Sequence, residues 1–409
     1  SFMEVDTTTL SANATAMALR FKNAAATTLT IDSGRTLNLP GSNGGNLGGI
    51  LVTPGAGRVE IVGGALSPGL NQWLHIHQYS ENPLLIGSLI SHNSNSIIKD
   101  GDGELIITNG ANGYSTMRIG RGTVSVYELT NRTLASPLGL GTPELADGTL
   151  RYLGEDVACD RMIALRGAGT LDASGAGTVR FTTNGIFMTP SVGSARVTLA
   201  GTSTGIVDGI FDLRLGGISK TGPGTWLLNS TNTYHGDTLV QSGTLIVKGD
   251  TGYGDVRVTG GTFGGNVRNA GSLTVQAGGT IAPGASIGTA SFEAVIMEAG
   301  SVYEWEVSSG NSADMLEARS FLQLPTAANS VTIRVVRIDS PLLTDTNTVV
   351  KTGQITDGDL NSIALVFAPG LSAGDVFIDG NEIKVTNLIP EPGVLGVLGL
   401  AALAVRKRR

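Results

Sequence analysis

Alternating carboxylates at residues 100–104 (DGDGE) are the first candidate for chemistry in this sequence. Acids two residues apart, here Asp100, Asp102 and Glu104, can converge on a hard cation such as Ca²⁺. A second copy of this turn, residues 221–225 (TGPGT), keeps both glycines and none of the acids. Because the turn is repeated and the carboxylates are not, the pattern favours a plain turn. Calcium binding at Asp100 and Asp102 is left as an open question.

Two imidazoles, His75 and His77, would project from the same face of a strand, and His92 follows not far along the chain. Two or three histidines can hold a metal ion. However, Trp73 and Tyr79 fall on the same alternation, and no acidic residue is closely spaced with them. The pattern therefore favours an exposed polar and aromatic face over a metal site. Aromatic rings on such a face are a hint of contact with sugars.

Three side chains have the chemistry of nucleophiles. Ser203 and Ser286 each lie in a G-x-S-x-G pentapeptide, which is the form of a nucleophile elbow. A chain this rich in glycine and serine is expected to match that pattern by chance, and neither serine lies at a predicted strand-to-helix turn. Cys159 has acidic neighbours, which would raise its pKa, so we expect a buried or incidental thiol. As the single cysteine, it excludes an intrachain disulfide and a zinc site made of cysteines.

Composition limits the kind of fold that can position these side chains. Glycine provides 59 of the 409 residues, charged residues make up 15% and apolar residues 41%. An apolar fraction this high supports a large core and argues against disorder. The formal net charge of −7 gives no basic surface, so no nucleic-acid partner is expected.

Short strands joined by tight turns dominate the pattern, with alternating runs broken by Gly, Asn or Asp every few residues. A Gly–polar–apolar tripeptide recurs along the chain, unevenly in its first four copies and almost regularly in its last four. The tripeptides begin at Gly103, Gly122, Gly148, Gly169, Gly224, Gly243, Gly261 and Gly279. A period of about 20 residues with strand character predicts an all-β solenoid over residues 20–300.

Each tripeptide has a structural interpretation. Glycine allows the positive φ of a coil corner, and the apolar residue points into the coil interior. A longer repeat supports this interpretation, because residues 99–124 align with 220–245 when each copy is given one single-residue gap. The aligned pairs include Lys99 with Lys220 and Tyr114 with Tyr234.

The second copy resembles a known repeat family. Residues 220–225 (KTGPGT), 232–236 (NTYHG) and 243–245 (GTL) are similar to the opening, centre and close of the autotransporter-associated β-strand repeat. Residues 283–289 (PGASIGT) are similar to a segment that often follows such repeats. The resemblance implies a right-handed parallel β-helix that is exported from the cell.

The sequence divides into four parts that differ in the regularity of the repeat, in glycine content and in charge. Residues 1–96 predict irregular N-terminal coils, and residues 97–300 predict the regular coils with the repeats. Residues 301–387 lose glycine and gain charge at Glu304, Glu306, Asp314, Glu317 and Arg319. This third part predicts a β cap, because a solenoid must protect its last edge from pairing with other chains. Residues 388–409 form a distinct tail.

The tail has three elements in order: Pro390-Glu391-Pro392, an uncharged apolar run at 393–405, and the basic cluster Arg406, Lys407, Arg408 and Arg409. The apolar run predicts a short helix of about 20 Å, against a hydrocarbon core of about 30 Å. It is therefore short for a permanent span, unless flanking residues such as Leu388 and Ile389 extend it, and it suits transient membrane anchoring. The basic cluster would stay on the cytoplasmic side, with the β-rich body outside.

The order of these three elements resembles the PEP-CTERM sorting signal. That resemblance implies recognition by an exosortase in the inner membrane of a Gram-negative bacterium, cleavage near residues 390–392, and delivery of the body alongside exopolysaccharide. Proteins of this kind carry an N-terminal signal peptide, and the opening residues SFMEVDTTTL have no apolar segment. We therefore expect that a leader has been removed or that the sequence is a fragment.

These features favour an exported, non-catalytic scaffold or adhesin of the cell surface or extracellular matrix, associated with exopolysaccharide and needing no cofactor or metal. β-helices also host polysaccharide lyases and glycoside hydrolases, which use acids with Lys or Arg on one face of successive coils. Asp208, Asp212 and Arg214 are the nearest such set, in and just before a predicted strand at 209–215. They support the alternative of a glycan-cleaving enzyme. An autotransporter passenger is a third alternative.

Overall fold

A computed structural model of the chain describes residues 2–40, 48–68, 73–91, 96–183, 186–188, 194–268, 270–308, 312–337, 346–368, 371–372, 375–386 and 389–390. The chain forms two compact units, Ser1–Leu213 and Arg214–Arg409, each with its own buried core. Both units consist of strands. Within the described ranges, the sole helix is the short 3-10 turn η1 (Leu360–Ser362).

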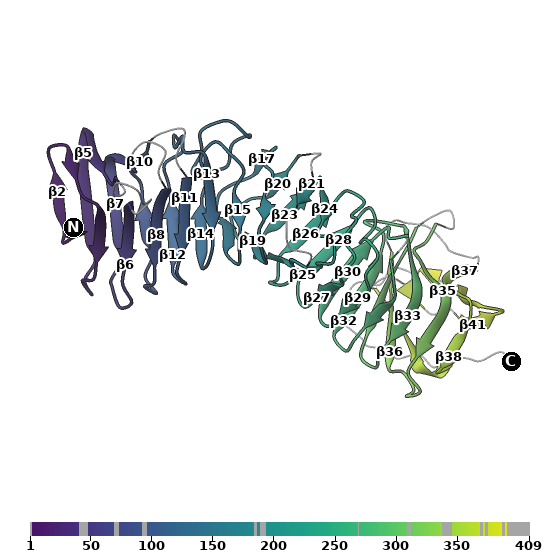
Figure 1. The fold of residues 1–409 in the computed structure, drawn as a ribbon. Helices are drawn as coiled ribbons and strands as arrows, with labels where there is room; N and C mark the ends of the chain where they lie inside the picture. Colours follow the sequence, from purple (N-terminus) through teal and green to yellow (C-terminus); the bar gives the residue numbers. More distant parts are fainter. Residues whose placement is uncertain are drawn as a thin grey trace. The chain divides into compact units, whose positions relative to one another are not determined.

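Strands of successive coils pair in parallel throughout the first unit (Figure 1). One sheet contains β1 (Phe2–Glu4), β4 (Ala18–Phe21), β6 (Gly48–Val52), β8 (Trp73–Gln78), β11 (Ser96–Asp100), β13 (Thr116–Ile119), β15 (Glu144–Leu145) and β18 (Ala164–Leu165). Another contains β2 (Thr8–Leu10), β3 (Ala14–Thr15), β5 (Thr27–Asn38), β7 (Val59–Ser67), β9 (Leu84–Ile86), β10 (Leu89–Ile90), β12 (Glu104–Ile107), β14 (Thr123–Val126), β16 (Thr149–Tyr152), β19 (Gly169–Ala173) and β22 (Val197–Ala200). Shorter stacks join β17 (Val157–Cys159), β20 (Val179–Phe181) and β23 (Thr204–Val207), and β21 (Ile186–Met188) with β24 (Ile210–Asp212).

The second unit repeats this plan with two stacks of parallel strands. One stack contains β25 (Ile218–Lys220), β27 (Thr238–Val240), β29 (Val256–Val258), β31 (Leu273–Val275), β33 (Thr289–Met297), β35 (Met315–Leu324), β37 (Asn347–Thr352) and β38 (Ile355–Asp357). The other contains β26 (Thr225–Leu228), β28 (Thr244–Val247), β30 (Gly261–Gly265), β32 (Gly279–Pro283), β34 (Val302–Val307), β36 (Val331–Arg337) and β39 (Ile363–Phe367).

The register of these sheets follows the tripeptide repeat. In the first unit the polar tripeptide residues pair in the order Glu104, Thr123, Thr149, Thr170, and in the second in the order Thr225, Thr244, Thr262, Thr280. The apolar residue after each of them is buried: Leu105, Val124, Leu150, Leu171, Trp226, Leu245, Phe263 and Ile281. Burial of one such side chain contributes roughly 1.5–3 kcal/mol. The predicted all-β solenoid is confirmed, because each unit is a parallel β-helix.

Coil length varies more widely than the repeat predicts. Thr225 pairs with Thr244 in a regular coil, whereas Leu29 pairs with Ile61 and Ile333 with Leu365, much further along the chain. The inward apolar rows are kept in these longer coils, so the extra residues lie in the turns between strands.

The corner glycines serve two different purposes, and the prediction of positive φ is right for part of the set. Gly122 and Gly243 each have φ of +66°, which L side chains rarely adopt. Gly103 and Gly148 have no such φ, so there the prediction is wrong. A Cβ at Gly103 would collide with the Ser80 carbonyl of the preceding coil. These positions need glycine because neighbouring coils approach closely.

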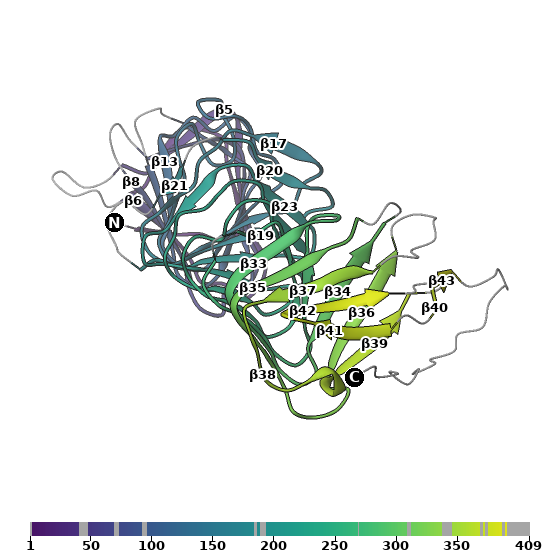
Figure 2. The same ribbon diagram turned by 90° about the vertical axis from the view of Figure 1, so that its right-hand side faces the viewer.

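Parallel coils continue past residue 300, since β34 pairs with β36 and β36 with β39. Antiparallel pairing of the kind expected of a cap begins with β37, onto which β42 (Glu382–Thr386) and then β41 (Asp375–Asp379) pack (Figure 2). This hairpin covers the edge of β37 and leaves fewer unpaired backbone groups there.

Most of the predicted sorting tail lies outside the described residues: the apolar helix, Glu391, Pro392, Arg406, Lys407, Arg408 and Arg409. Pro390 belongs to β43 (Ile389–Pro390), which pairs antiparallel with β40 (Leu371–Ser372). In the part of the chain that the structure describes, no helix has the length and apolar character needed to cross a membrane.

Candidate functional site

The two lysines aligned by the internal repeat are buried and structural. Lys99 takes an inward position, in register between Ile76 and Ile119 of the neighbouring coils. Its Nζ donates to the carbonyls of Gly101 (2.7 Å) and Arg121 (2.8 Å). Burial lowers its pKa to about 8. The ammonium therefore ties a coil corner to the next coil.

Lys220 makes the same arrangement in the second unit. Its Nζ donates to the carbonyls of Thr221 (2.8 Å), Gly222 (2.7 Å) and Ser242 (3.2 Å). Burial lowers the pKa of this lysine to about 8 as well. A Cβ at Gly243 would approach the ammonium to 2.6 Å, so the glycine leaves room for it.

The aligned tyrosines are buried as well. The Tyr114 hydroxyl donates to the carbonyl of Pro137, and the Tyr234 hydroxyl is 2.6 Å from Thr238 Oγ1. Burial raises the pKa of Tyr114 well above its ordinary value. The repeat motif thus supplies internal contacts, and the outward-facing positions are left for function.

The acids at residues 100–104 are engaged separately. Asp100 Oδ1 accepts the N–H of Gly101 at 2.8 Å, and Asp102 pairs with Arg121 at 3.2 Å on the surface. Glu104 pairs with Arg151 at 3.3 Å and accepts from the Ser125 hydroxyl. Among the described residues, no group of three or more His, Cys, Asp or Glu is placed to hold a metal ion.

Trp73, His75, His77 and Tyr79 lie on the outward face of β8 and just after it; we call them the aromatic strip. The His75 and His77 rings are 6.3 Å apart, and the His77 and Tyr79 rings are 6.2 Å apart with planes only 7° from parallel. Burial, with the neighbouring His77, lowers the pKa of His75. Arg118 lies 5.6 Å from the centre of the Trp73 ring. His92 lies outside the described residues.

The candidate nucleophiles are not placed for catalysis by any contact within the described ranges. Ser203 precedes β23 and its hydroxyl donates to the carbonyl of Gly175. Ser286 is exposed in the turn between β32 and β33, and no described hydrogen bond joins it to an imidazole. Cys159 is buried as a free thiol, and burial raises its pKa.

Asp208 and Asp212, the acids that would serve a glycan-cleaving enzyme, both belong to the first unit. Asp208 follows β23 and pairs with Arg180 of the neighbouring coil at 2.8 Å. Asp212 is the last residue of β24 and is half-buried. Arg214 begins the second unit in a left-handed conformation, with φ of +53°, and is exposed.

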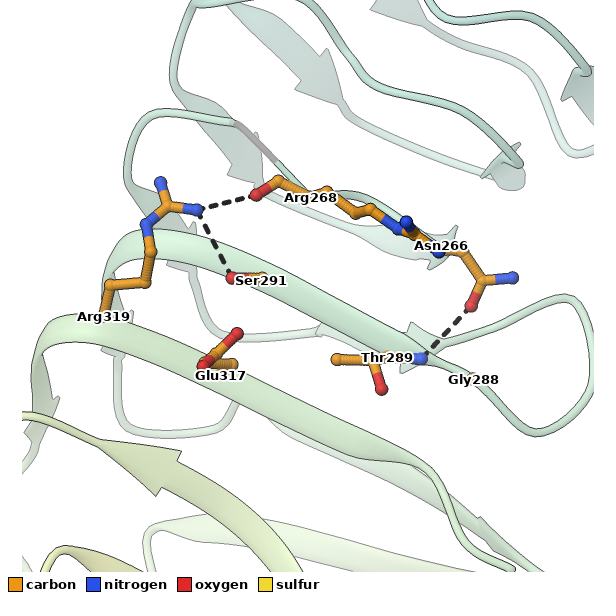
Figure 3. Close-up of a pocket in the computed structure, with 7 residues that line it drawn as sticks. All are labelled: Asn266, Arg268, Gly288, Thr289, Ser291, Glu317 and Arg319. Atoms are coloured by element: carbon orange, nitrogen blue, oxygen red, sulfur yellow. Dashed lines mark hydrogen bonds between the residues drawn. The ribbon is translucent and has the colours of Figure 1, made fainter.

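A polar groove of about 640 Å³ lies in the second unit (Figure 3). We call it the Arg268–Glu317 groove; it is lined by Asn266, Arg268, Gly288, Thr289, Ser291, Glu317 and Arg319. Strands β33 and β35 form its floor, and their parallel register places Ser291 beside Glu317. Since alternate side chains of a strand share a face, Thr289 and Ser291 point to the same side.

The opposite side of the groove is formed by Asn266 and Arg268, which come directly after β30 in the chain. Asn266 Oδ1 accepts the N–H of Thr289 at 3.1 Å, which ties this segment to the start of β33. The Arg268 N–H donates to Asp250 Oδ1 at 2.8 Å and fixes the backbone, while its exposed side chain runs along the groove toward Asn266 (Figure 3).

Arg319 closes one end of the groove (Figure 3). The register of β33 and β35 shifts here, so that Arg319 and Ser320 stand opposite Glu293, as in a bulge. Arg319 Nη1 donates to the Arg268 carbonyl (2.7 Å) and the Ser291 hydroxyl (3.3 Å). Its Nε lies 3.4 Å from Glu293 Oε2, so a carboxylate already balances this cation.

Two ionic groups of the groove remain available for a ligand. Neither the Arg268 guanidinium nor the Glu317 carboxylate has a hydrogen bond or ion pair with any residue that the structure describes. The hydroxyls of Thr289 and Ser291 lie on the floor of the groove, between these two ionic groups. The Asn266 amide lies at the end of the groove opposite Arg319. One signal of this site is visible in the sequence, the rise in charge that includes Glu317 and Arg319, and there is none for Asn266 or Arg268.

Two segments, residues 97–126 and 218–247, match the family described as Passenger-associated-transport-repeat. Over 221 residues, 52% of this chain, the sequence is 29% identical to the Adhesin BmaC autotransporter of Brucella suis biovar 1 (strain 1330), of which the match covers 5%. Over 105 residues, 25% of this chain, it is 36% identical to the Extracellular serine protease of Serratia marcescens, of which the match covers 10%. The chain thus spans a tenth or less of these curated relatives. The autotransporter-type repeat identified at residues 220–245 is confirmed, and the segment that aligns with it in the first unit matches the same family.

Proposed function

We propose that this chain is part of an exported, adhesin-like scaffold on the surface or in the extracellular matrix of a Gram-negative bacterium, without catalytic activity of its own. The observation that carries the proposal is the pair of passenger-associated repeats, each built into a parallel β-helix by an inward lysine and a buried tyrosine. One relative is named as an adhesin and the other as extracellular. Both names support a location outside the cell.

Polysaccharide is the partner class that the outward-facing side chains favour. The aromatic strip gives stacked rings beside Arg118, and the Arg268–Glu317 groove gives hydroxyl, amide and ionic groups. Because a solenoid holds its core between neighbouring coils, its exterior can present many such weak contacts without loss of the fold. We propose that the partner is extracellular polysaccharide of the producing cell.

Sorting through the C-terminal tail is the proposed route of export, and it rests on the sequence of residues 390–409. An exosortase would cleave near Pro390, Glu391 and Pro392 after transient anchoring by the apolar run. Mass spectrometry of protein shed from the native cell should find a C-terminus near Pro392. Recovery of an intact peptide that ends at Arg409 would contradict this route.

Retention on polysaccharide tests the function. The purified chain is incubated with a panel of immobilised neutral and acidic polysaccharides, and both retention and the release of reducing or unsaturated ends are scored. Retention without new ends is expected. Cleavage that disappears in Asp208→Asn or Asp212→Asn would overturn the non-catalytic proposal in favour of a lyase or hydrolase, and retention on none of the polysaccharides would overturn the choice of partner.

A further inference from the structure

The Arg268–Glu317 groove has the size and the chemistry of a ligand site that the repeat fold itself does not require. Its volume of about 640 Å³ falls within the range of roughly 300–1,000 Å³ usual for small-molecule sites. The backbone of each wall is fixed by bonds that do not use the free groups: Asn266 to Thr289, Arg268 N–H to Asp250, and Arg319 to the Arg268 carbonyl. A preformed site with unused polar groups is suited to binding without rearrangement.

The charges around the groove exclude strongly ionic ligands. Arg319 is balanced by Glu293, and Arg268 faces a groove that also contains Glu317. A polyanion such as a nucleic acid would need several uncompensated cations, and a phosphate would be repelled by Glu317. Among the described lining residues there is no apolar or aromatic side chain to anchor a peptide, which usually binds through such groups.

A ligand that is rich in hydroxyl groups and has no net charge fits the polar and ionic groups of the groove. Arg268 supplies donors, Glu317 supplies acceptors, and Thr289 and Ser291 supply hydroxyls that can do either. Adjacent hydroxyls of a sugar ring both donate and accept, so a saccharide can bond to a guanidinium and to a carboxylate. Hydrogen bonds to charged groups are the stronger ones, so these two side chains should dominate affinity.

We propose that the Arg268–Glu317 groove is a binding site for one or two units of a neutral saccharide. The proposal rests on the function proposed above and specifies it, since it names where on the second unit a polysaccharide is held and which sugars are accepted.

Calorimetric titration of the full chain with neutral gluco-, galacto- and manno-oligosaccharides and with an oligogalacturonate tests this site. Glu317→Gln keeps the side-chain length, Arg268→Gln shortens the side chain, and each substitution removes one charge. Arg257→Gln on β29 and Glu128→Gln in the first unit are matched controls, because both residues are exposed and lie outside the groove lining. Circular dichroism confirms that each variant is folded.

At least one neutral oligosaccharide should bind the unaltered chain and both controls equally, and each groove variant should bind it about tenfold or more weakly. Equal binding by the groove variants would overturn the site, and preference for the oligogalacturonate would overturn its chemistry. If the groove variants are still retained on polysaccharide like the unaltered chain, the inference fails and the proposed function stands. If the unaltered chain binds no saccharide and is retained on no polysaccharide, both fail.

Discussion

Replacement of Lys220 by Met should loosen one coil corner of the second unit. The ammonium donates three hydrogen bonds to backbone carbonyls, and an unmade bond to a buried group costs about 1–3 kcal/mol. Against this loss stands the cost of burying the charge, about 3 kcal/mol for a pKa lowered from 10.5 to about 8. At roughly 1.5–2 kcal/mol for each of the three bonds, about 4.5–6 kcal/mol in all, the variant should lose a net of about 1–3 kcal/mol of local stability.

Amide hydrogen exchange measures this loss at defined positions. The amides of Gln241 and Thr244 bond to the carbonyls of Lys220 and Gly224, on the two sides of the corner. Their protection should fall about 5- to 150-fold in Lys220→Met, while amides of β36 keep theirs because a solenoid coil interacts mainly with its neighbours. Lys248→Met is the matched control, because Lys248 is exposed at the end of β28.

The pH dependence gives the stricter test. Because the folded state binds the Lys220 proton less tightly than the unfolded state does, stability gained from this residue rises between about pH 8 and pH 10.5 and is constant below pH 8. The difference in stability between the unaltered chain and Lys220→Met should therefore widen by up to about 3 kcal/mol over that range. A difference that stays constant or narrows would show that the lysine is not buried with its charge, and would refute the reasoning.

Three further substitutions test other internal contacts. Arg161 is buried and donates to the carbonyls of Thr130, Leu134, Gly139 and Gly141, so Arg161→Lys should expose the loop at 128–143 to limited proteolysis while the rest of the first unit resists; an unchanged digest would contradict this. Burial raises the pKa of Asp314 to about 7, so this residue should add up to about 4 kcal/mol of stability as the pH falls from 7 to 4, and the difference in urea unfolding between the unaltered chain and Asp314→Asn should move in favour of the unaltered chain by that amount; a difference that does not change with pH would contradict this. Tyr234→Phe loses the bond to Thr238 and should cost about 1 kcal/mol in the same unfolding assay; no measurable loss would mean that Thr238 finds another partner.

The β-helix could be predicted because its period is carried by neighbouring residues in the chain. A Gly–polar–apolar tripeptide marks each coil at one point, and two successive coils that each contain one must place the two tripeptides in register. The register of Thr225 with Thr244 follows directly. The sequence could not show the length of the irregular coils, because an insertion in a turn leaves the inward rows at Leu29 and Ile61 unchanged.

The burial of Lys99 and Lys220 could have been predicted from the alternation of their strands, although a charged residue is not expected at an inward position. Ile97 and Lys99 are two residues apart on one strand, as are Ile218 and Lys220, so each lysine shares the inward face with an isoleucine. Lysine is seldom buried without a partner. Here the partners are backbone carbonyls of the corner, which belong to no side-chain motif and become visible when the coils are stacked.

The Arg268–Glu317 groove could not be predicted, for a reason that also bears on how this fold acquires function. Its residues come from three coils, at Asn266, Ser291 and Glu317, with spacings set by those coils and not by the repeat. The repeat positions are occupied by inward side chains and corner glycines, which cannot change without disturbing the next coil. Outward positions have no such constraint, so a site there is assembled from residues that share no local pattern. Substitutions at Arg268 or Glu317 should therefore alter binding while the amide protection of β33 and β35 stays unchanged. A loss of that protection in either variant would show that these side chains stabilise the β-helix itself.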